Sequence, residues 1–504
     1  MKPQKPLIMK TIGVLLLTLT IITTIQAQIT IGTETQVNTY TADDQYRQKV
    51  AYDNAGNYII VWASVLQDSS GEGIYAQRYD MNGNTIGTEF LVNTTTADDQ
   101  YDPDVVFDSN GNFVIVWISA YQDGDDDGIF FQRFNASGIK LGSEVQVNQN
   151  FISIQVHPTI DMAPNGNFAV SWISFDPNTG TDDIMVRLFD ASGNAVSSDI
   201  LVFKAACCQF AQTDIAMCDN GNFVITYNHL DNSGRGVFAQ LFDSSGAPLT
   251  AIFPVNTFTT NDQDFADVDM SPNGMFVITW SSWDQDSSDY GIYAQRFDTL
   301  GNPVGSEIWV NTDYTWSRQG KPVIAMDDTG NFTIVWASWW NDGDGNAVKA
   351  KRFLADGTPI GPEFQVNTTT LNNQEEPKVA MTSTGEFIVV WQSWDQDGSN
   401  NGVYFQRYSS AIPSYVEDYN LSDHAFVFPN PVKEIANVYL DNEISGNIDV
   451  TIFDISGKII EHNKFEKMSP SCNYKINMNG LMPGTYIITL KNNEHIAHYR
   501  VIKQ

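Results

Sequence analysis

The chain has 504 residues, of which 42% are hydrophobic and 12% aromatic, a composition that excludes a disordered protein and allows a large packed core. Its formal net charge is −33. The first 27 residues contribute +3 and residues 425–504 are neutral, which leaves −36 on residues 28–424. A negative field of this size repels nucleic acid and anionic membranes, so we exclude both as partners.

Residues 1–27 have the pattern of a secretory signal peptide. Three lysines precede an apolar stretch over residues 12–22, and Ala27 supplies a small residue for cleavage. The apolar stretch is short for a membrane anchor, and no later segment is long and apolar enough to span a bilayer. We therefore expect an exported protein without a transmembrane segment.

A repeat of about 55 residues occupies the next part of the chain, residues 28–409. Its marker is a glycine followed six residues later by an aromatic residue. The seven copies of this marker are Gly56/Trp62, Gly111/Trp117, Gly166/Trp172, Gly221/Tyr227, Gly274/Trp280, Gly330/Trp336 and Gly385/Trp391. Spacing this regular indicates one supersecondary unit that is repeated seven times.

Each copy contains four short strand patterns, which we call A, B, C and D. Strand B, for example residues 113–117, is apolar on both faces and must therefore be covered on both. Four-stranded sheets stacked around an axis meet that need, whereas a linear solenoid is the alternative. The mature chain begins with a D pattern at 31–38 and its repeats end with a C pattern at 402–408. The sequence therefore predicts an all-β fold, a seven-bladed β-propeller whose N-terminal strand completes the last blade.

Side chains that recur in nearly every copy are interpreted as structural, because chemistry normally needs one copy of a residue. The recurring amides are Gln45, Gln100, Gln155, Gln263, Gln319 and Gln374, together with Asn38, Asn93, Asn148, Asn256, Asn311 and Asn367. We expect them to satisfy buried backbone groups. Candidate functional residues are then those that break the repeat.

The B–C and D–A loops are expected on one face of the propeller, and they carry most of its acid. Within one B–C loop, Asp123, Asp125 and Asp127 reproduce the opening of a calcium-binding loop, although the closing glutamate is absent and Phe134 stands there. The functional interpretation is one or several calcium sites. The alternative is that these aspartates simply form solvated turns.

Tryptophans gather on the same face, at the B–C and D–A loops of the last three copies: Trp283, Trp316, Trp339, Trp340 and Trp394. Flat aromatic rings beside carboxylates are suited to sugar rings, so we interpret them as a candidate ligand-binding surface for glycan or peptide. The alternative is that these indoles cover the interfaces between blades.

Other reactive side chains give less information. Cys208 and Cys218 are a candidate disulfide, but both flank one predicted strand, which would hold them far apart. His157 and His229 are the histidines of the repeat region, and a histidine pair without a nucleophile does not identify a catalytic site. No catalytic residue can be singled out from the sequence.

After a polar linker at residues 410–424, the composition changes and short strand patterns with Gly and Pro turns indicate a small β-sandwich. Residues 426–432 read Phe-Val-Phe-Pro-Asn-Pro-Val. Further motifs lie at 450–458 and 481–490, and the chain ends on Tyr499-Arg500-Val501-Ile502-Lys503-Gln504.

In these motifs and their order, residues 425–504 resemble the type A C-terminal sorting domain of the type IX secretion system of Bacteroidetes. The resemblance implies export through that machinery as a partner, followed by release or attachment at the outer cell surface. Such domains are appended to many kinds of protein, so the resemblance does not indicate what the propeller does.

The main interpretation is a secreted or surface-attached binding protein that recognises extracellular glycan or protein, with calcium as its only candidate cofactor. The first alternative is an extracellular enzyme, a polysaccharide hydrolase or lyase. The second is a structural surface component. Carboxylates paired at a glycosidase-like separation, or a basic residue poised against them, would favour the enzyme.

Overall fold

The computed structural model describes residues 28–152, 154–176, 180–204, 212–313, 317–411, 425–429, 431–440, 446–454, 458–467, 472–491 and 496–504. The chain divides after Pro413 into two compact units. The predicted signal peptide and linker residues 412–424 lie outside the described residues. The described part contains no helix, and therefore none that is long and apolar enough to cross a membrane.

The first unit consists, within the described residues, of seven four-stranded sheets, which we call blades 1 to 7. Blades 1 to 3 are β2 (Gln45–Tyr52), β3 (Tyr58–Val65), β4 (Glu72–Tyr79), β5 (Phe90–Leu91); β6 (Gln100–Phe107), β7 (Phe113–Ala120), β8 (Asp127–Phe134), β9 (Val145–Gln146); and β10 (Ile154–Met162), β11 (Phe168–Asp176), β12 (Thr181–Phe189), β13 (Ile200–Lys204). Blades 4 to 6 are β14 (Thr213–Met217), β15 (Phe223–Leu230), β16 (Arg235–Phe242), β17 (Phe253–Pro254); β18 (Gln263–Met270), β19 (Phe276–Trp283), β20 (Tyr290–Phe297), β21 (Ile308–Trp309); and β22 (Gln319–Met326), β23 (Phe332–Trp339), β24 (Asn346–Phe353), β25 (Phe364–Gln365). Blade 7 is β26 (Gln374–Met381), β27 (Phe387–Trp394), β28 (Asn401–Tyr408) and β1 (Thr30–Gln36). The prediction of an all-β propeller is confirmed.

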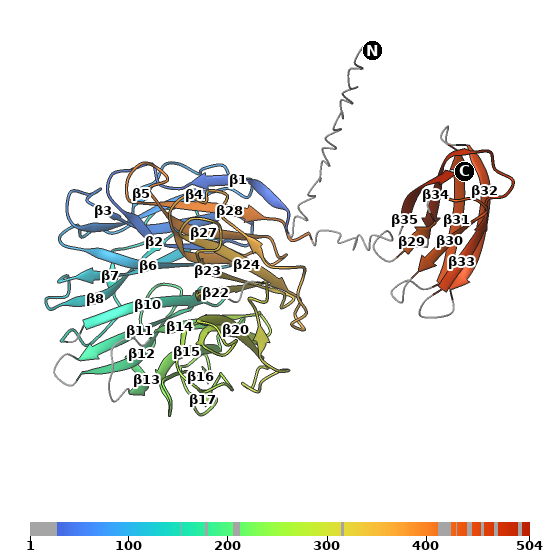
Figure 1. The fold of residues 1–504 in the computed structure, drawn as a ribbon. Helices are drawn as coiled ribbons and strands as arrows, with labels where there is room; N and C mark the ends of the chain where they lie inside the picture. Colours follow the sequence, from blue (N-terminus) through green and yellow to red (C-terminus); the bar gives the residue numbers. More distant parts are fainter. Residues whose placement is uncertain are drawn as a thin grey trace, which may run out of the picture. The chain divides into compact units, whose positions relative to one another are not determined.

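The first and last blades are joined by the N-terminal strand. β1 pairs antiparallel with β28, and in Figure 1 the blue strand lies beside the orange one. Gln28 donates a 2.5 Å hydrogen bond to the Ser409 carbonyl and accepts one of 2.6 Å from Arg352. β2 packs against β26 and β27, and one core cluster contains Trp62 of blade 1 and Val403 of blade 7. Blades 1 and 7 are therefore neighbours.

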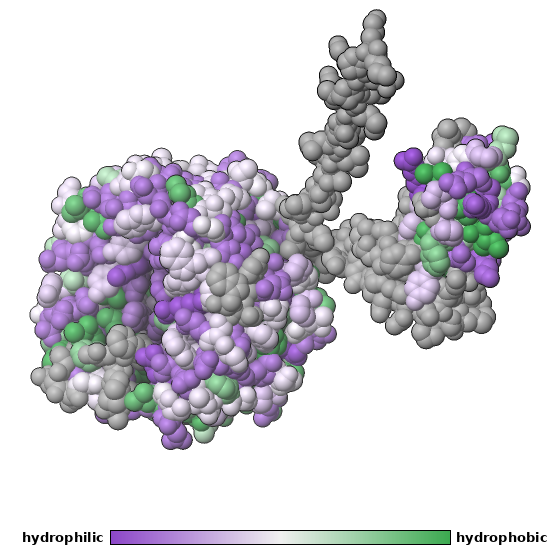
Figure 2. Space-filling view, in the orientation of Figure 1, coloured by the Kyte–Doolittle hydropathy of each residue, from purple (hydrophilic) through white to green (hydrophobic). Residues whose placement is uncertain are grey.

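The core lies between adjacent blades because strand B of each blade is buried on both faces. All residues of β7, for example, are buried. The marker tryptophans, including Trp117 and Trp336, are fully buried. Rings also stack across strands, as in Phe113 and Phe134 with centroids 4.8 Å apart. By contrast, the face seen in Figure 2 is mostly hydrophilic, with small scattered hydrophobic patches.

The recurring amides satisfy buried backbone groups, as expected. Asn93 accepts a 2.8 Å bond from the Ile74 amide and donates one of 3.0 Å to Gln100. Gln100 in turn donates 2.7 Å to the Ala97 carbonyl of the D–A loop. The same triad of bonds recurs around Asn38, Asn256 and Asn367.

The register places the D–A and B–C loops on one face. Gln45 at the start of β2 pairs with Ser64 near the end of β3, and Val65 donates to the Asp44 carbonyl at 2.9 Å. The first strand of every blade therefore begins on this face, which we call the loop face.

The second unit contains two sheets. β29 (Ala425–Phe428), β30 (Ile435–Leu440) and β33 (Cys472–Asn477) form one, and β31 (Gly446–Asp454), β32 (Ile459–Lys467), β34 (Gly484–Lys491) and β35 (Ile496–Lys503) form the other. Val438 of the first sheet and Ile488 of the second belong to the same buried cluster. The unit is a small β-sandwich.

Candidate functional site

The first strands of six blades carry the same irregularity near the loop face. Each shows a register shift against its neighbour, and the residue at the shift has a φ between +50° and +56°. These residues are Arg47, Asp102, His157, Phe265, Lys321 and Glu376. Positive φ is unfavourable for such side chains and is retained mostly where function or surrounding structure requires it.

The six bulge residues line a cavity of about 420 Å³, which we call the central cavity. It is lined by the first strand of every blade, so it lies where the seven blades converge. Blade 4, whose paired β14 and β15 show no register shift, contributes Gln212 and Asp214. The repeated backbone therefore presents a different side chain from each blade to one shared space.

His157 and Asp102 form the cavity's histidine–carboxylate pair. The His157 Nδ1 lies 3.1 Å from the Asp102 Oδ2, and the His157 side chain is 52% exposed. Burial alone would raise the pKa of Asp102, but the hydrogen bond and charge of His157, with Arg47 and Lys49 nearby, hold that pKa below its usual value. Asp102 is thus an ionised acceptor that orients the imidazole, an arrangement suited to proton transfer.

A second ion pair lies on the other side of the cavity, between Lys321 of blade 6 and Glu376 of blade 7. The Lys321 Nζ also lies 5.9 Å from the centre of the Phe265 ring. Gln48 of blade 1 donates a 2.5 Å bond to the Glu376 carbonyl. Both acidic bulge residues are therefore matched by a basic group.

Arg47 is different, because it has no ion pair within 4.0 Å in the described part of the chain. Its guanidinium stacks near the rings of Tyr46 and Tyr101, at 5.3 and 4.6 Å from their centroids. The Arg47 Nη1 is buried and has no hydrogen-bond partner. Lys49, two residues further along, lies 3.4 Å from Asp104.

Deeper along the strands, carboxylates join one blade to the next. Each accepts a bond from a backbone amide of the following blade: Asp104 from Ile160 (3.2 Å), Asp161 from Met217 (2.5 Å), Asp214 from Val268 (2.9 Å), Asp267 from Ile324 (2.8 Å) and Asp269 from Met326 (2.7 Å). These aspartates therefore have a structural role. Residue type alone could not have distinguished them from catalytic carboxylates.

We expect the stability of the propeller to fall as the pH rises from about 4 to 8. Burial, with repulsion from Asp269, raises the pKa of Asp161 to about 8, and burial raises that of Asp269 to about 7. The folded state thus holds protons that the unfolded chain releases near pH 4, and this contribution is lost as the pH passes the folded pKa values. Urea unfolding across this range measures the slope. Asp161→Asn should reduce it, and an unchanged slope in that variant would contradict the assignment.

The tryptophans predicted from the sequence lie outside the central cavity. Trp283, Trp340 and Trp394 are exposed on the loop face, at 41%, 67% and 43%. Trp339 is partly buried, with the Arg318 guanidinium 4.9 Å from its ring. Trp316 lies outside the described residues. These side chains remain a candidate binding surface and are not part of the cavity.

The aspartates of the predicted calcium loop are engaged separately. Asp123 accepts from the Asp125 amide at 3.3 Å and from Gln146 at 3.2 Å, whereas Asp127 accepts from the Tyr101 hydroxyl at 2.7 Å. Among the described residues, no three His, Cys, Asp or Glu side chains are grouped so as to hold a metal. Calcium binding at this loop stays a prediction.

A thermal melt tests that prediction. If the loop binds calcium, the melting temperature should rise with added calcium relative to chelator at fixed ionic strength, because the ion stabilises only the folded state. Magnesium should not reproduce the rise. Equal melting temperatures in calcium and chelator would leave these aspartates with the turn and hydrogen-bond roles just described.

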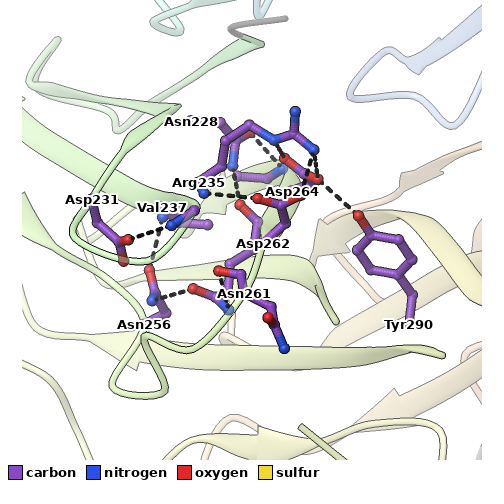
Figure 3. A network of polar contacts seen from close by, with 12 residues as sticks. Asn228, Asp231, Arg235, Val237, Asn256, Asn261, Asp262, Asp264 and Tyr290 are labelled. Carbon is purple, nitrogen blue, oxygen red and sulfur yellow. Dashed lines mark hydrogen bonds and ion pairs between the residues drawn. The ribbon is translucent and has the colours of Figure 1, made fainter. Parts of the chain in front are cut away.

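An acidic network also links blades 4 and 5 on the loop face (Figure 3). Arg235 bonds to Asp264 at 2.5 and 2.7 Å and to Asp262 at 3.0 Å, and Tyr290 donates to Asp264 at 3.1 Å. The side chain of Asp264 is buried, and these bonds satisfy its carboxylate oxygens. In the figure Arg235 and Tyr290 approach Asp264 from different strands.

We expect Arg235→Ala to lower the free energy of unfolding by about 1–3 kcal/mol, because it leaves the Asp264 charge buried without its main partner. Chemical denaturation measures the loss. Lys204→Ala removes an exposed ion pair to Asp183 (2.9 Å) and should cost less than about 1 kcal/mol. Equal losses in the two variants would contradict a stabilising role for the network.

The other sequence candidates lie elsewhere. His229 is on β15, where its Nδ1 lies 2.8 Å from the Leu230 carbonyl, and it does not line the central cavity. Cys218 is buried, with its thiol donating to Asn220, whereas Cys208 lies outside the described residues. Sequence reasoning noticed only His157 among the bulge residues, assigned it no catalytic role, and missed the others. The signal that could have found them is the position nine residues before each marker glycine, where the residue type differs in all seven copies.

Comparison with known proteins identifies the second unit. Residues 426–504 match the family model of the secretion system C-terminal sorting domain. The sequence-based resemblance is therefore confirmed, and the chain is a secreted protein that the type IX machinery delivers to the extracellular space or the cell surface. No curated protein matches the chain.

Several solved structures resemble the propeller at low identity. The α-L-arabinanase of Penicillium chrysogenum has 14% identity and a TM-score of 0.42, covering 61% of this chain and 92% of its own. The β-propeller domain of the Trilobed protease of Pyrococcus furiosus has 8% identity and a TM-score of 0.43, and the match covers 75% of this chain and 99% of that one. The polysaccharide lyase Uly1 has 10% identity and a TM-score of 0.44, and the match covers 77% of this chain and 98% of that one. Likenesses at this level carry no argument about function.

Proposed function

We propose that this secreted propeller is an enzyme that acts on extracellular polysaccharide, as a hydrolase or a lyase, with the central cavity as its active site. The observation that carries the proposal is the His157–Asp102 pair, placed at a strained backbone position that repeats in six blades but holds a different side chain in each. Packing alone gives no reason for such variety at a repeated position.

The cavity contains groups suited to proton transfer. Hydrolysis of a glycosidic bond needs proton transfer to the leaving oxygen and activation of water, and elimination needs removal of a proton from the sugar ring. The imidazole of His157, oriented by Asp102, is available for either role. Basic groups paired with both Asp102 and Glu376 meet the criterion that favours an enzyme over a simple binding surface.

The size of the cavity suits a sugar unit. Ligand sites of proteins are commonly clefts of about 300–1,000 Å³ with a few convergent polar groups. The central cavity, at about 420 Å³, lies within this range. Tyr46 and Phe265 add aromatic surface to its polar lining. The proposed site can therefore enclose part of a polysaccharide chain.

The exposed tryptophans favour a second candidate function, that of a glycan-binding protein. Trp283, Trp340 and Trp394 offer flat, exposed surfaces on the loop face. If this function holds, replacing Trp340 and Trp394 by alanine abolishes glycan binding, whereas variants in the cavity leave it unchanged.

Incubation of the mature chain with a panel of neutral and acidic polysaccharides tests the enzyme proposal. Release of reducing ends would reveal either reaction, and ultraviolet absorbance of a new carbon–carbon double bond would identify elimination. We expect activity on at least one polysaccharide, lost in His157→Asn. Binding of glycans without any cleavage would overturn the enzyme and favour the binding protein.

A further inference from the structure

Two cations of the central cavity form no close ion pair among the described residues, in a region that otherwise carries strong negative charge. Residues 28–424 have a net charge of −36, so a basic side chain there has many carboxylates within reach. Yet neither Arg47 of blade 1 nor Lys378 of blade 7 makes an ion pair within 4.0 Å in the described residues. Both line the central cavity, on neighbouring blades.

Arg47 is held ready for a planar anion. The Arg47 guanidinium lies near the rings of both Tyr46 and Tyr101, and these contacts limit the freedom that binding would otherwise remove. Its Nη1 is buried without an acceptor, and a buried donor without a partner is costly. A carboxylate would supply that acceptor, because the guanidinium fork matches its two oxygens.

Lys378 adds a second positive group. Burial, and then repulsion from Lys49, lower the pKa of Lys378, although the carboxylates of Asp267, Glu376 and Asp214 act in the opposite direction. An anion beside Lys378 would offset the repulsion from Lys49. Of the three carboxylates, that of Glu376 is already bound to Lys321.

Unpartnered polar atoms elsewhere in the same cavity indicate what kind of molecule carries the anion. Gln48, between Arg47 and Lys49 in sequence, is fully buried, and its Oε1 has no hydrogen-bond partner. Thr159 lines the same cavity with a buried, unpartnered Oγ1. A ligand that matches this set carries an anionic group together with hydroxyls, which is the chemistry of an acidic sugar.

We propose that the central cavity binds the carboxylate of a uronic acid between Arg47 and Lys378, so that the substrate is an acidic polysaccharide. That the bound sugar is a substrate rests on the proposed function, whereas its binding in the cavity is independent of catalysis. Sulfated sugars share the negative charge, and the experiment separates them.

Equilibrium binding to the mature chain carrying His157→Asn tests the inference without turnover. The probes are oligosaccharides of galacturonate, glucuronate and alginate, each compared with its carboxyl-reduced counterpart of the same length and linkage. A sulfated neutral oligosaccharide forms a third arm. We expect at least one uronate to bind at least tenfold more tightly than its reduced counterpart, and more tightly than the sulfated sugar, with an affinity that falls as salt increases.

Variants locate the binding group. Arg47→Gln should remove the preference for the acid, and Arg47→Lys, which keeps the charge but not the fork, should restore only part of it. Lys378→Gln should weaken it. Arg78→Gln is the matched control, because Arg78 also lies near an aromatic ring (Phe113, 5.9 Å) but bonds to Ala136 outside the cavity. It should leave the preference unchanged.

Three outcomes would overturn the inference: no uronate in the panel binds, acid and reduced sugars bind equally, or Arg47→Gln keeps the full preference. A stronger preference for the sulfated sugar would also overturn it. Uronate preference without cleavage by the wild-type chain would overturn the proposed enzymatic function but support uronate binding in the cavity. Cleavage of a neutral polysaccharide, unaffected by Arg47→Gln, would support the enzymatic function but overturn uronate binding.

Discussion

Replacement of His157 by asparagine is expected to lower kcat/KM on the cleaved polysaccharide by a factor of about 10²–10⁴, the usual contribution of a positioned acid–base group. Asparagine is chosen because it tolerates the positive φ of 53° at this position. Initial rates on the polysaccharide found in the screen measure the effect. Because the His157 side chain is half exposed, the melting temperature should change little.

The controls separate chemistry from folding. His229→Asn, also on the loop face but outside the cavity, should retain full activity. Asp102→Asn should lower the rate, since it removes the carboxylate that orients the imidazole of His157. A His157→Asn variant with wild-type activity would exclude this histidine from the reaction.

Removal of residues 28–38 is expected to unfold or aggregate the propeller. The deletion exposes the edge of β28, removes the buried side chains of Gln28, Val37 and Asn38, and leaves Arg352 without one of its acceptors. Several buried groups lose their partners at once, each at about 1–3 kcal/mol. Guanidinium unfolding of the shortened chain measures the loss.

Rescue in trans shows whether the strand itself is responsible. A synthetic peptide of residues 28–40, added to the shortened chain, should restore the unfolding midpoint in a concentration-dependent way by pairing with β28. Thr33→Ala in the intact chain changes one exposed side chain of the same strand and should have little effect. A shortened chain as stable as the intact one would contradict the role assigned to β1.

The fold could be predicted because its information is local and repeated. Strand B of each copy is apolar on both faces, and the marker glycine fixes where each strand A ends and each strand B begins. The recurring Asn and Gln residues were assigned correctly, since a side chain needed in every blade must serve a bond made in every blade. The sorting domain was recognised from motifs that are specific in themselves.

The candidate site could not be placed from residue types. The tryptophans were chosen because indoles bind sugars, but at the repeated position each blade presents a different residue type to the cavity. Of these seven residues, only His157 was noticed in the sequence, and no role was assigned to it. Six of them converge because a bulge turns strand A of their blade at the same point, and a bulge in one strand leaves no signal in a single copy. Aligned on the marker glycines, Arg47, Asp102 and His157 occupy one position with Gln212, Phe265, Lys321 and Glu376. The absence of any shared residue type at that position is the signal.

The central claim is that ligand binds in the central cavity. Hydrogen exchange of the His157→Asn variant, with and without an oligosaccharide of the polysaccharide it no longer cleaves, tests this claim most directly. The account predicts protection on segments 46–49, 102–103, 157–159 and 321–323, which line the cavity. Protection confined to the loops around Trp340 and Trp394, with no change on the cavity strands, would contradict it.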